Sequence, residues 1–219
     1  MSEETCYLVT SCIPLKKGHY EVSFLHADGD TCSMTIHEET VIEYRLVEKK
    51  ELTQTTFSQV MVSGAFATSY GYAVSILSRR MYTQKEIREK LKERSVESKV
   101  IKQVIDKLLA LQLLDDASYA SAFIESQLSA GKKSHERIRM DLLQKGVSSF
   151  ILEDLAHLFD EVQEFDVIMN EITQSWRRYA RKELTDFERR AKIVAAVCRK
   201  GFDVDDVLSQ YQIFIDENS

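Results

Sequence analysis

The sequence has little proline and little glycine, the two residues that turns consume most. Pro14 is the only proline among 219 residues, and there are seven glycines. Because helices joined by short turns need neither residue in quantity, this scarcity indicates a mainly helical chain. Hydrophobic residues make up 44% of the chain and charged residues 29%, which is typical of a folded globular protein.

Long apolar runs and paired cysteines are also missing. We expect no membrane span, because no apolar run approaches the roughly 20 residues that one needs. The start MSEETCYLVT is unlike a secretory signal, because no basic segment precedes an apolar core. The four cysteines form no CxxC pair, and scattered thiols fit a reducing compartment better than a disulfide framework. We therefore expect a cytoplasmic protein that contacts no membrane.

Signatures of catalysis and of ligand binding are missing as well. None of the five histidines belongs to an HExxH motif or to a Cys/His ligand spacing, and no phosphate-binding glycine loop occurs. Cys198, within VAAVCRK, is interpreted as a structural thiol on an apolar helix face. The acidic pairs Asp115-Asp116 and Asp205-Asp206 fall at expected helix starts, where they favour the helix dipole. We predict no catalytic residue, metal or cofactor, and hence a protein that is not an enzyme.

Basic residues are fewer than acidic residues in the whole chain, but not in every part of it. The formal net charge is −6. Residues 1–60 hold 5 basic and 10 acidic residues, residues 61–202 hold 24 basic and 20 acidic, and residues 203–219 hold 5 acidic and no basic. A mildly basic middle between two acidic ends can contact a polyanion, which the ends would repel.

Strand signals are confined to the first fifty residues. The runs CYLVTSCI, YEVSFLH and DTCSMTI are rich in β-branched and aromatic residues, and Asp28-Gly29 separates the last two. An Asp-Gly pair between such runs predicts a hairpin, since its turn needs positive φ. We expect a small antiparallel sheet followed by a short helix over residues 40–46.

From about Thr53 the apolar period becomes that of a helix. Thr83 and Glu86 have the spacing of a capping box that opens the helix QKEIREKLKER. Residues 97–114 carry one apolar stripe with charged residues opposite. Further helices are expected over residues 66–80, 116–129, 148–159 and 164–181.

An internal repeat is the most informative feature of the chain. A shift of 51 residues places Thr83 on Ser134, Ile87 on Ile138 and Leu91 on Leu142. A further shift of 55 residues superposes Ile138 on Ile193, Leu142 on Val197, and Lys145-Gly146-Val147 on Lys200-Gly201-Phe202. Gly146 and Gly201 follow helix ends, where glycine can adopt a left-handed turn.

The repeat predicts a mainly α fold. Three tandem three-helix repeats would form an elongated, curved array that carries a small N-terminal antiparallel β-sheet subdomain. The parts expected are the β-rich subdomain with its short helix (1–52), a linking helix with the first repeat (53–114), the second repeat (115–160), and the third repeat with an acidic tail (161–219). Such arrays usually bind large partners, although a mere stacking scaffold is the alternative.

Basic clusters are the candidate contact sites. Three of the four fall at or near the end of a repeat's first helix, where evenly placed cations suit a phosphate backbone or an acidic groove. Solvated helix ends are the plainer interpretation. Trp176 and Tyr179 flank the third cluster and would either contact the partner or pack in the core. The candidates for partner or DNA binding are Arg79, Arg80, Lys132, Lys133, Arg137, Arg139, Arg177, Arg178, Arg181 and Lys182; Arg189-Arg190 with Lys192 form the fourth cluster.

These segments resemble the RecX family. The family pattern LxRRxxSxxEL is similar to Leu77, Arg79, Arg80, Thr83, Glu86 and Ile87, and its Asp-Tyr-Ala entry to the second repeat to Asp116, Tyr119 and Ala120. The pattern RIxxELxxKGI is similar to Arg137, Ile138, Asp141, Leu142, Lys145, Gly146 and Val147, and the third basic-Gly-Phe turn to Lys200, Gly201 and Phe202. The leader ending in Lys50, Glu51 and Leu52 is similar to the low-GC Gram-positive branch.

The resemblance implies a cytoplasmic protein that binds the RecA–DNA filament, and we expect this chain to be a monomer. It would inhibit or modulate recombinase, ATPase and coprotease activity in DNA repair, recombination and the SOS response, and some family members also bind DNA directly. The basic clusters of this chain could likewise contact single- or double-stranded DNA. An alternative is a sequence-tolerant DNA-binding protein or transcription regulator with homeodomain-like units. A base reader would need Arg, Asn or Gln clustered on one recognition helix, and the helices over residues 97–111 and 148–159 offer few such groups.

Overall fold

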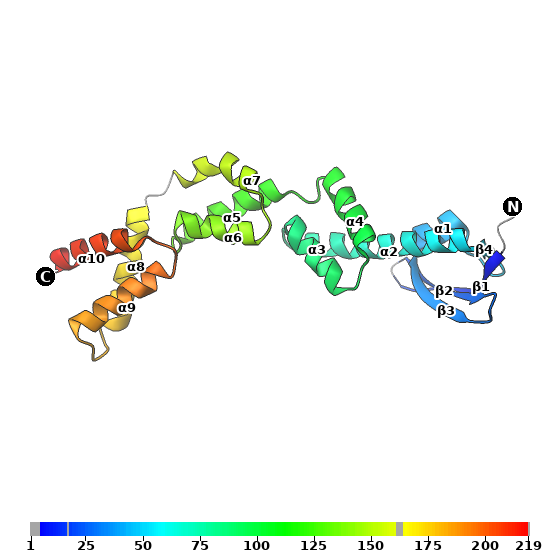
Figure 1. The fold of residues 1–219 in the computed structure, drawn as a ribbon, viewed down its shortest axis with the longest axis horizontal. Helices are drawn as coiled ribbons and strands as arrows, with labels where there is room; N and C mark the ends of the chain where they lie inside the picture. The colour runs from blue at the N-terminus through cyan, green and yellow to red at the C-terminus, as the bar shows by residue number, and fades with distance from the viewer. Residues whose placement is uncertain (1–4, 17, 161–163, 219) are drawn as a thin grey trace. The chain divides into compact units, whose positions relative to one another are not determined.

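The computed structural model describes residues 5–16, 18–160 and 164–218. The chain divides into two compact units, Met1–Leu114 and Asp115–Ser219, and each is described by itself (Figure 1). The division into four parts expected from the sequence remains a proposal. Its boundary after residue 160 borders residues 161–163, which lie outside the described residues.

The first unit begins with a four-stranded antiparallel sheet in the order β3-β2-β1-β4. The bounds are β1 Thr5–Pro14, β2 His19–His26, β3 Thr31–His37 and β4 Glu51–Thr53. The predicted hairpin joins β2 to β3. Gly29 has a φ of 94°, and the N–H of His26 donates to the carbonyl of Asp30 at 2.8 Å. The sheet is therefore confirmed, while the short strand β4 was not expected.

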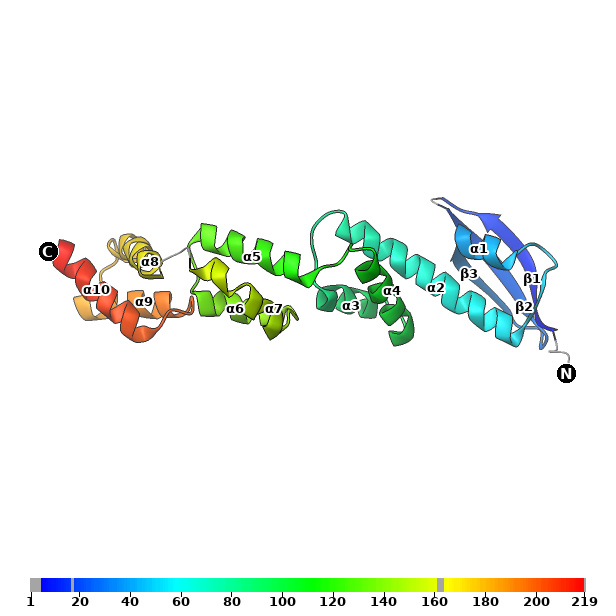
Figure 2. The same ribbon diagram turned by 90° about the horizontal axis from the view of Figure 1, so that it is seen from above.

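Helices α1 and α2 pack on one face of this sheet, and α2 continues beyond it to α3 and α4 (Figure 2). Their bounds are α1 Glu38–Tyr44, α2 Gln54–Leu77, α3 Gln84–Glu93 and α4 Ser98–Ala110. The short helix lies two residues earlier than the predicted 40–46. The capping box at Thr83 is confirmed, since its side chain accepts from Glu86 and the Glu86 side chain accepts from the N–H of Thr83.

Helix α2 corrects two expectations. A linking helix followed by a separate helix over 66–80 is wrong, because α2 is one continuous helix of 24 residues. The expectation about apolar runs is also wrong, since this helix has the length and composition that could cross a membrane. Its apolar residues have local partners: Phe57 and Val60 pack on the sheet, and Ala73 belongs to the core formed with α3 and α4. Packing in two cores accounts for the buried apolar residues of α2, while its exposed positions carry uncharged side chains such as Ser58 and Gln59.

The second unit contains two further three-helix repeats. Their bounds are α5 Asp116–Ala130, α6 His135–Gln144, α7 Ser149–Asp154 with the 3-10 helix η1 Ala156–Phe159, α8 Glu164–Tyr179, α9 Asp186–Cys198 and α10 Val204–Asn218. The single helix predicted over 148–159 is thus broken at Leu155. The two repeats keep separate cores, one around Ile138 and Leu142 and the other around Ile193 and Val197.

A left-handed residue ends the second helix of every repeat. Gly146 has a φ of 87° and Gly201 of 97°, as the sequence predicted for C-terminal glycines. Ser95 occupies the equivalent position in the first repeat with a φ of 58°. The N–H of Val96 donates to Leu91 at 3.2 Å, as the N–H of Val147 does to Leu142 at 3.1 Å. The turn is therefore the same whether or not glycine is present.

The second and third repeats interlock at this turn. The N–H of Ser134, at the start of α6, donates to the carbonyl of Lys200 at 3.1 Å. A Cβ on Gly201 would lie 2.5 Å from the Ser134 Oγ and 2.6 Å from the Arg137 Cβ. The buried carboxylate of Glu171 pairs with the Lys200 ammonium beside it. Glycine is therefore required at position 201 for two reasons: the positive φ of the backbone, and the close approach of the neighbouring repeat.

We expect Ser95→Gly to stabilise the first unit. A non-glycine residue in the left-handed region costs about 1 to 2 kcal/mol. Glycine avoids this cost, but it makes the unfolded chain more flexible, which lowers the stability by about 0.5 to 1 kcal/mol. The free energy of unfolding should therefore rise by about 0.5 to 1 kcal/mol. Urea unfolding followed by circular dichroism measures the change. Ser98→Gly, inside the start of α4, should lower the stability instead. A lower midpoint for Ser95→Gly would contradict the role assigned to this turn.

We expect Gly201→Ala to destabilise the second unit by about 2 to 4 kcal/mol, because backbone strain adds to a steric clash. The fluorescence of Trp176, the only tryptophan, reports unfolding of this unit. Gly131→Ala is the control: its φ is 57°, but its Cβ would meet only the Leu128 carbonyl at 3.9 Å. If Gly201→Ala and Gly131→Ala lower the free energy of unfolding equally, the close packing around Gly201 does not contribute to the stability of the second unit.

Candidate partner-binding surface

In the first repeat, the candidate cations directly follow α2. Arg79 and Arg80 are exposed in the turn after Leu77. The guanidinium carbon of Arg80 lies 3.8 Å from the centre of the Tyr82 ring, and the Lys90 ammonium lies 5.6 Å from the same ring. The aromatic ring attracts both cations and restricts their positions. The first repeat therefore holds Arg80 and Lys90 against the same ring, while Arg79 is exposed.

In the second repeat, most candidate cations already have internal partners. The Lys133 Nζ lies 2.7 Å from the Asp141 carboxylate, and the Arg137 Nε lies 3.2 Å from its other oxygen. The guanidinium carbon of Arg139 lies 4.6 Å from the Phe159 ring centre. Because Asp141 offsets one of these charges, the cluster is less positive than its sequence indicates. Lys132 is exposed and has no ion pair within the described part of the chain.

In the third repeat, the candidate cations are open to solvent. Arg177 and Arg178 lie in the last turn of α8, where the helix dipole favours positive charge. Arg181 and Lys182 follow in the next turn, and the Lys182 ammonium lies 5.1 Å from the Tyr179 ring centre. All four are exposed, and within residues 164–218 none of them forms an ion pair. This is the most accessible of the predicted clusters.

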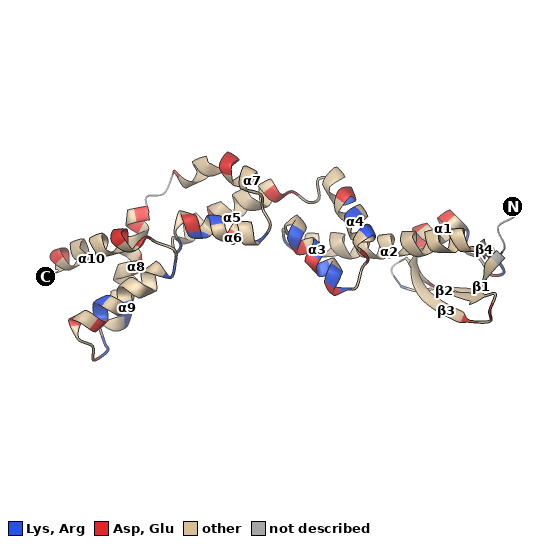
Figure 3. Ribbon diagram, viewed as in Figure 1, with Lys and Arg blue, Asp and Glu red and all other residues tan. Residues whose placement is uncertain are grey.

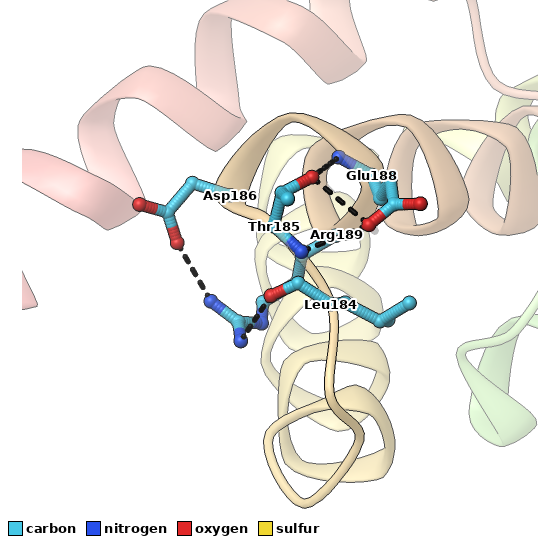
Figure 4. Close-up of polar contacts among 5 residues, drawn as sticks. All are labelled: Leu184, Thr185, Asp186, Glu188 and Arg189. Atoms are coloured by element: carbon cyan, nitrogen blue, oxygen red, sulfur yellow. Dashed lines mark hydrogen bonds and ion pairs between the residues drawn. The ribbon is translucent and has the colours of Figure 1, made fainter.

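Arg189 differs from these cations because it holds the α8–α9 loop (Figure 4). Its guanidinium donates to the Asp186 carboxylate at 2.8 Å and to the Leu184 carbonyl at 3.3 Å. The same group lies 5.3 Å from the centre of the Trp176 ring, which packs on Phe214 at 5.5 Å between ring centres. Trp176 and Arg189 therefore serve packing within the repeat.

The sequence reasoning missed a basic face on the first repeat. Three exposed cations lie on one side of α3: Lys85, Arg88 and Lys92. Lys102 of α4 is exposed as well. Figure 3 shows cations along both helices. Their spacing of three and four residues was a signal that a helical plot of QKEIREKLKER would have revealed.

A groove of about 950 Å³ also lies in the first unit, between α2 and α4. Tyr44, Val62 and Phe66 supply its apolar wall, and Lys99 and Lys107 line the side formed by α4. Within the described residues no three His, Cys, Asp or Glu side chains are grouped so that they could hold a metal ion. The groove is therefore a surface feature without an assigned ligand.

The fold and these surfaces define a tandem three-helix-repeat protein with an N-terminal sheet and exposed cations at or just after the end of the first helix of each repeat. Residues 70–108 match the family model described as the RecX first three-helix domain, and residues 115–154 match that of the second. Together with the relatives described next, these matches place the chain in the RecX family.

Relatives of the chain share both its sequence and its fold. A regulatory protein RecX of Finegoldia magna is 30% identical over 187 residues, which are 84% of each chain. One of Streptococcus sanguinis is 27% identical over 84% of this chain and 69% of its own. A crystal structure of regulatory protein RecX is 25% identical, with a TM-score of 0.65 over 96% of this chain and 99% of that one. The predicted resemblance is thereby confirmed, including its similarity to low-GC Gram-positive relatives.

We expect Arg189→Ala to lower the free energy of unfolding of the second unit by about 1 to 2 kcal/mol. The variant loses two hydrogen bonds and the contact with Trp176. The Trp176 fluorescence measures both the stability and the changed ring environment. Lys192→Ala, an exposed position on the same helix, should change the stability by less than about 0.5 kcal/mol. Equal behaviour of the two variants would mean that Arg189 is an ordinary surface cation.

Proposed function

We propose that this chain binds the RecA filament on DNA and inhibits or modulates its recombinase, ATPase and coprotease activities. It would act in the bacterial cytoplasm during recombination, DNA repair and the SOS response. Membership of a family of regulatory proteins supports this assignment. The observation that carries the site is the recurrence of exposed cations at or just after the end of the first helix of each repeat.

The mechanism proposed is steric and electrostatic. Cations presented at equivalent places in successive repeats suit a partner that repeats its own negative charge, as a nucleoprotein filament does. Repeats of this chain that lie across neighbouring RecA subunits would then oppose the subunit movements that accompany ATP hydrolysis. This function needs no catalytic residue and no cofactor in the regulator itself. The curvature of the repeat array and a monomeric state remain predictions.

The ten predicted contact residues contribute unequally in this proposal. Arg177, Arg178, Arg181 and Lys182 carry most of it, because they are exposed and have no ion pair within residues 164–218. Arg79, Arg80 and Lys132 come next. Lys133, Arg137 and Arg139 contribute less, because Asp141 and Phe159 already engage them.

We expect the double variant Arg177→Ala/Arg178→Ala to weaken inhibition of DNA-dependent ATP hydrolysis by the cognate RecA. Loss of two accessible arginines should raise the concentration for half-maximal inhibition by about tenfold. The control Lys16→Ala/Lys50→Ala removes the same charge from exposed positions of the N-terminal subdomain. The control should stay within about twofold of the unmodified chain.

The same assay separates this proposal from its alternative. If the chain at several-fold molar excess leaves ATP hydrolysis unchanged, the proposed function is wrong. If inhibition occurs but both double variants behave alike, the family role stands and the proposed contact residues are wrong. Inhibition that disappears when DNA is supplied in large excess would favour the DNA-binding alternative.

A further inference from the structure

Strand β3 forms an open edge of the sheet in the first unit. At the opposite edge β4 and the loop before it cover β1, and the Val9 N–H donates to the Lys50 carbonyl at 2.8 Å. Strand β3 pairs with β2 and, within the described residues, with no other strand. Natural sheets usually protect such an edge with lysine, proline, a bulge or a very short strand. Residues 31–36 (TCSMTI) contain no charge and no proline, and their pairing with β2 has no bulge, so this edge is unprotected.

The pairing with β2 determines which backbone groups face outward. Along an antiparallel ladder, residues that bond the neighbouring strand alternate with residues that face away from it. At one end of the β2–β3 ladder the His26 N–H donates to the Asp30 carbonyl at 2.8 Å. At the other end the Glu38 N–H donates to the Gly18 carbonyl, also at 2.8 Å. Both ends place the even-numbered residues of β3 in the bonded set. The N–H and C=O groups that face away from β2 without a backbone partner in the described part of the chain therefore belong to Thr31, Ser33 and Thr35.

A hollow of about 420 Å³ lies along this edge. Its lining on the strand side is Met34, Thr35 and Ile36. Because successive side chains of a strand point to opposite faces, a hollow that reaches all three residues lies beside the strand and not over one face of the sheet. The other walls come from α2 and from the turn between α3 and α4, and they include Met61, Ala65, Thr68, Arg94, Val96 and Val100.

Helix α2 passes over this edge and limits what can pair with it. Phe57 and Val60 pack on the sheet, and a Cβ on Gly64 would lie 3.7 Å from the Ile36 side chain. Ala73, further along the helix, already belongs to the core with α3 and α4. The helix therefore leaves the sheet past β3. A second copy paired through its own β3 would place its α2 on the same side of the joined sheet, where the two helices would collide. A single extended peptide carries no such helix.

The edge and its walls define the chemistry of that peptide. A row of alternating N–H donors and C=O acceptors is complementary to another extended backbone, whereas a phosphate chain could accept only from the N–H groups and would face the carbonyl oxygens. Side chains of the peptide that point towards α2 would meet Met61, Ala65 and Val96, which favour apolar groups. The charged residues in the lining are one cation and one anion, Arg94 and Glu97, so the hollow selects neither sign of charge.

We infer that β3 is a docking site for an extended, uncharged peptide segment of another protein, which adds to the sheet as a further strand and places an apolar side chain in the hollow at every second position. Each outward-facing residue of β3 can then exchange two hydrogen bonds with the segment. This site goes beyond the proposed function and does not depend on it, since none of the ten candidate cations lines the hollow.

The test uses the full chain and a short fluorescein-labelled peptide of alternating valine and threonine. Anisotropy should show binding to the unmodified chain. Thr35→Pro removes one outward N–H while the bonds from β3 to β2 remain, so it should weaken binding by about tenfold. Thr35→Val keeps this N–H and is the matched control, which should change binding by less than about twofold.

A second pair of variants tests the hollow without altering β3. Ala65→Gln introduces a larger, uncharged side chain at an exposed position of α2 that lines the hollow, and it should weaken binding by about tenfold. Ser75→Gln, at an exposed position of the same helix outside this lining, should change binding by less than about twofold. This pair gives a result even if Thr35→Pro fails to fold.

Two modified peptides test the backbone pairing itself. One carries N-methyl groups on every valine, and the other carries them on every threonine. Because only alternate N–H groups of an added strand face its neighbour, one peptide should lose binding and the other should keep it. Equal affinities of the two methylated peptides would overturn strand addition.

Other outcomes would also overturn the inference. The valine–threonine peptide would then fail to bind at millimolar concentration, or Ala65→Gln and Ser75→Gln would have equal effects. Sedimentation that shows a dimer of the unmodified chain and a monomer of Thr35→Pro would assign the edge to a second copy instead. The assay contains neither RecA nor DNA, so its failure is separate from failure of the proposed function.

Discussion

The left-handed turn after the second helix is the constraint on which each repeat depends. It sets the angle at which the third helix crosses the second, and therefore the core between them. In the second unit the turn at Gly201 also receives the start of α6, with the Ser134 N–H bonded to the Lys200 carbonyl. One backbone conformation thus organises both the interior of a repeat and the junction with its neighbour.

Because the turn and the core fix the repeat, its outer faces are free to differ. The cores keep aliphatic pairs at Ile87–Leu91, Ile138–Leu142 and Ile193–Val197. The outer faces carry a different distribution of charge in each repeat. A repeat protein can therefore combine several binding chemistries in one scaffold, and the net charge of −6 says little about any single surface.

Much of the fold follows from the sequence, because apolar period and capping chemistry are local. The capping box at Thr83, the turn at Gly29 and the glycines at 146 and 201 were all predictable for this reason. The continuity of α2 was not, since it depends on two cores that one helix spans. The candidate cations were found by clustering, but clustering does not show which are engaged: Asp141 holds Lys133 and Arg137, and Arg189 holds a loop. The basic face of α3 was missed because its residues are spaced along a helix.

The central claim is that exposed cations on successive repeats bind a RecA filament. The most direct measurement is the affinity of the full chain for RecA assembled on single-stranded DNA, and for the same DNA alone, over a range of salt concentrations. The account predicts tight binding to the filament that weakens as salt rises, and much weaker binding to bare DNA. Equal affinities for filament and bare DNA, with the same salt dependence, would contradict it.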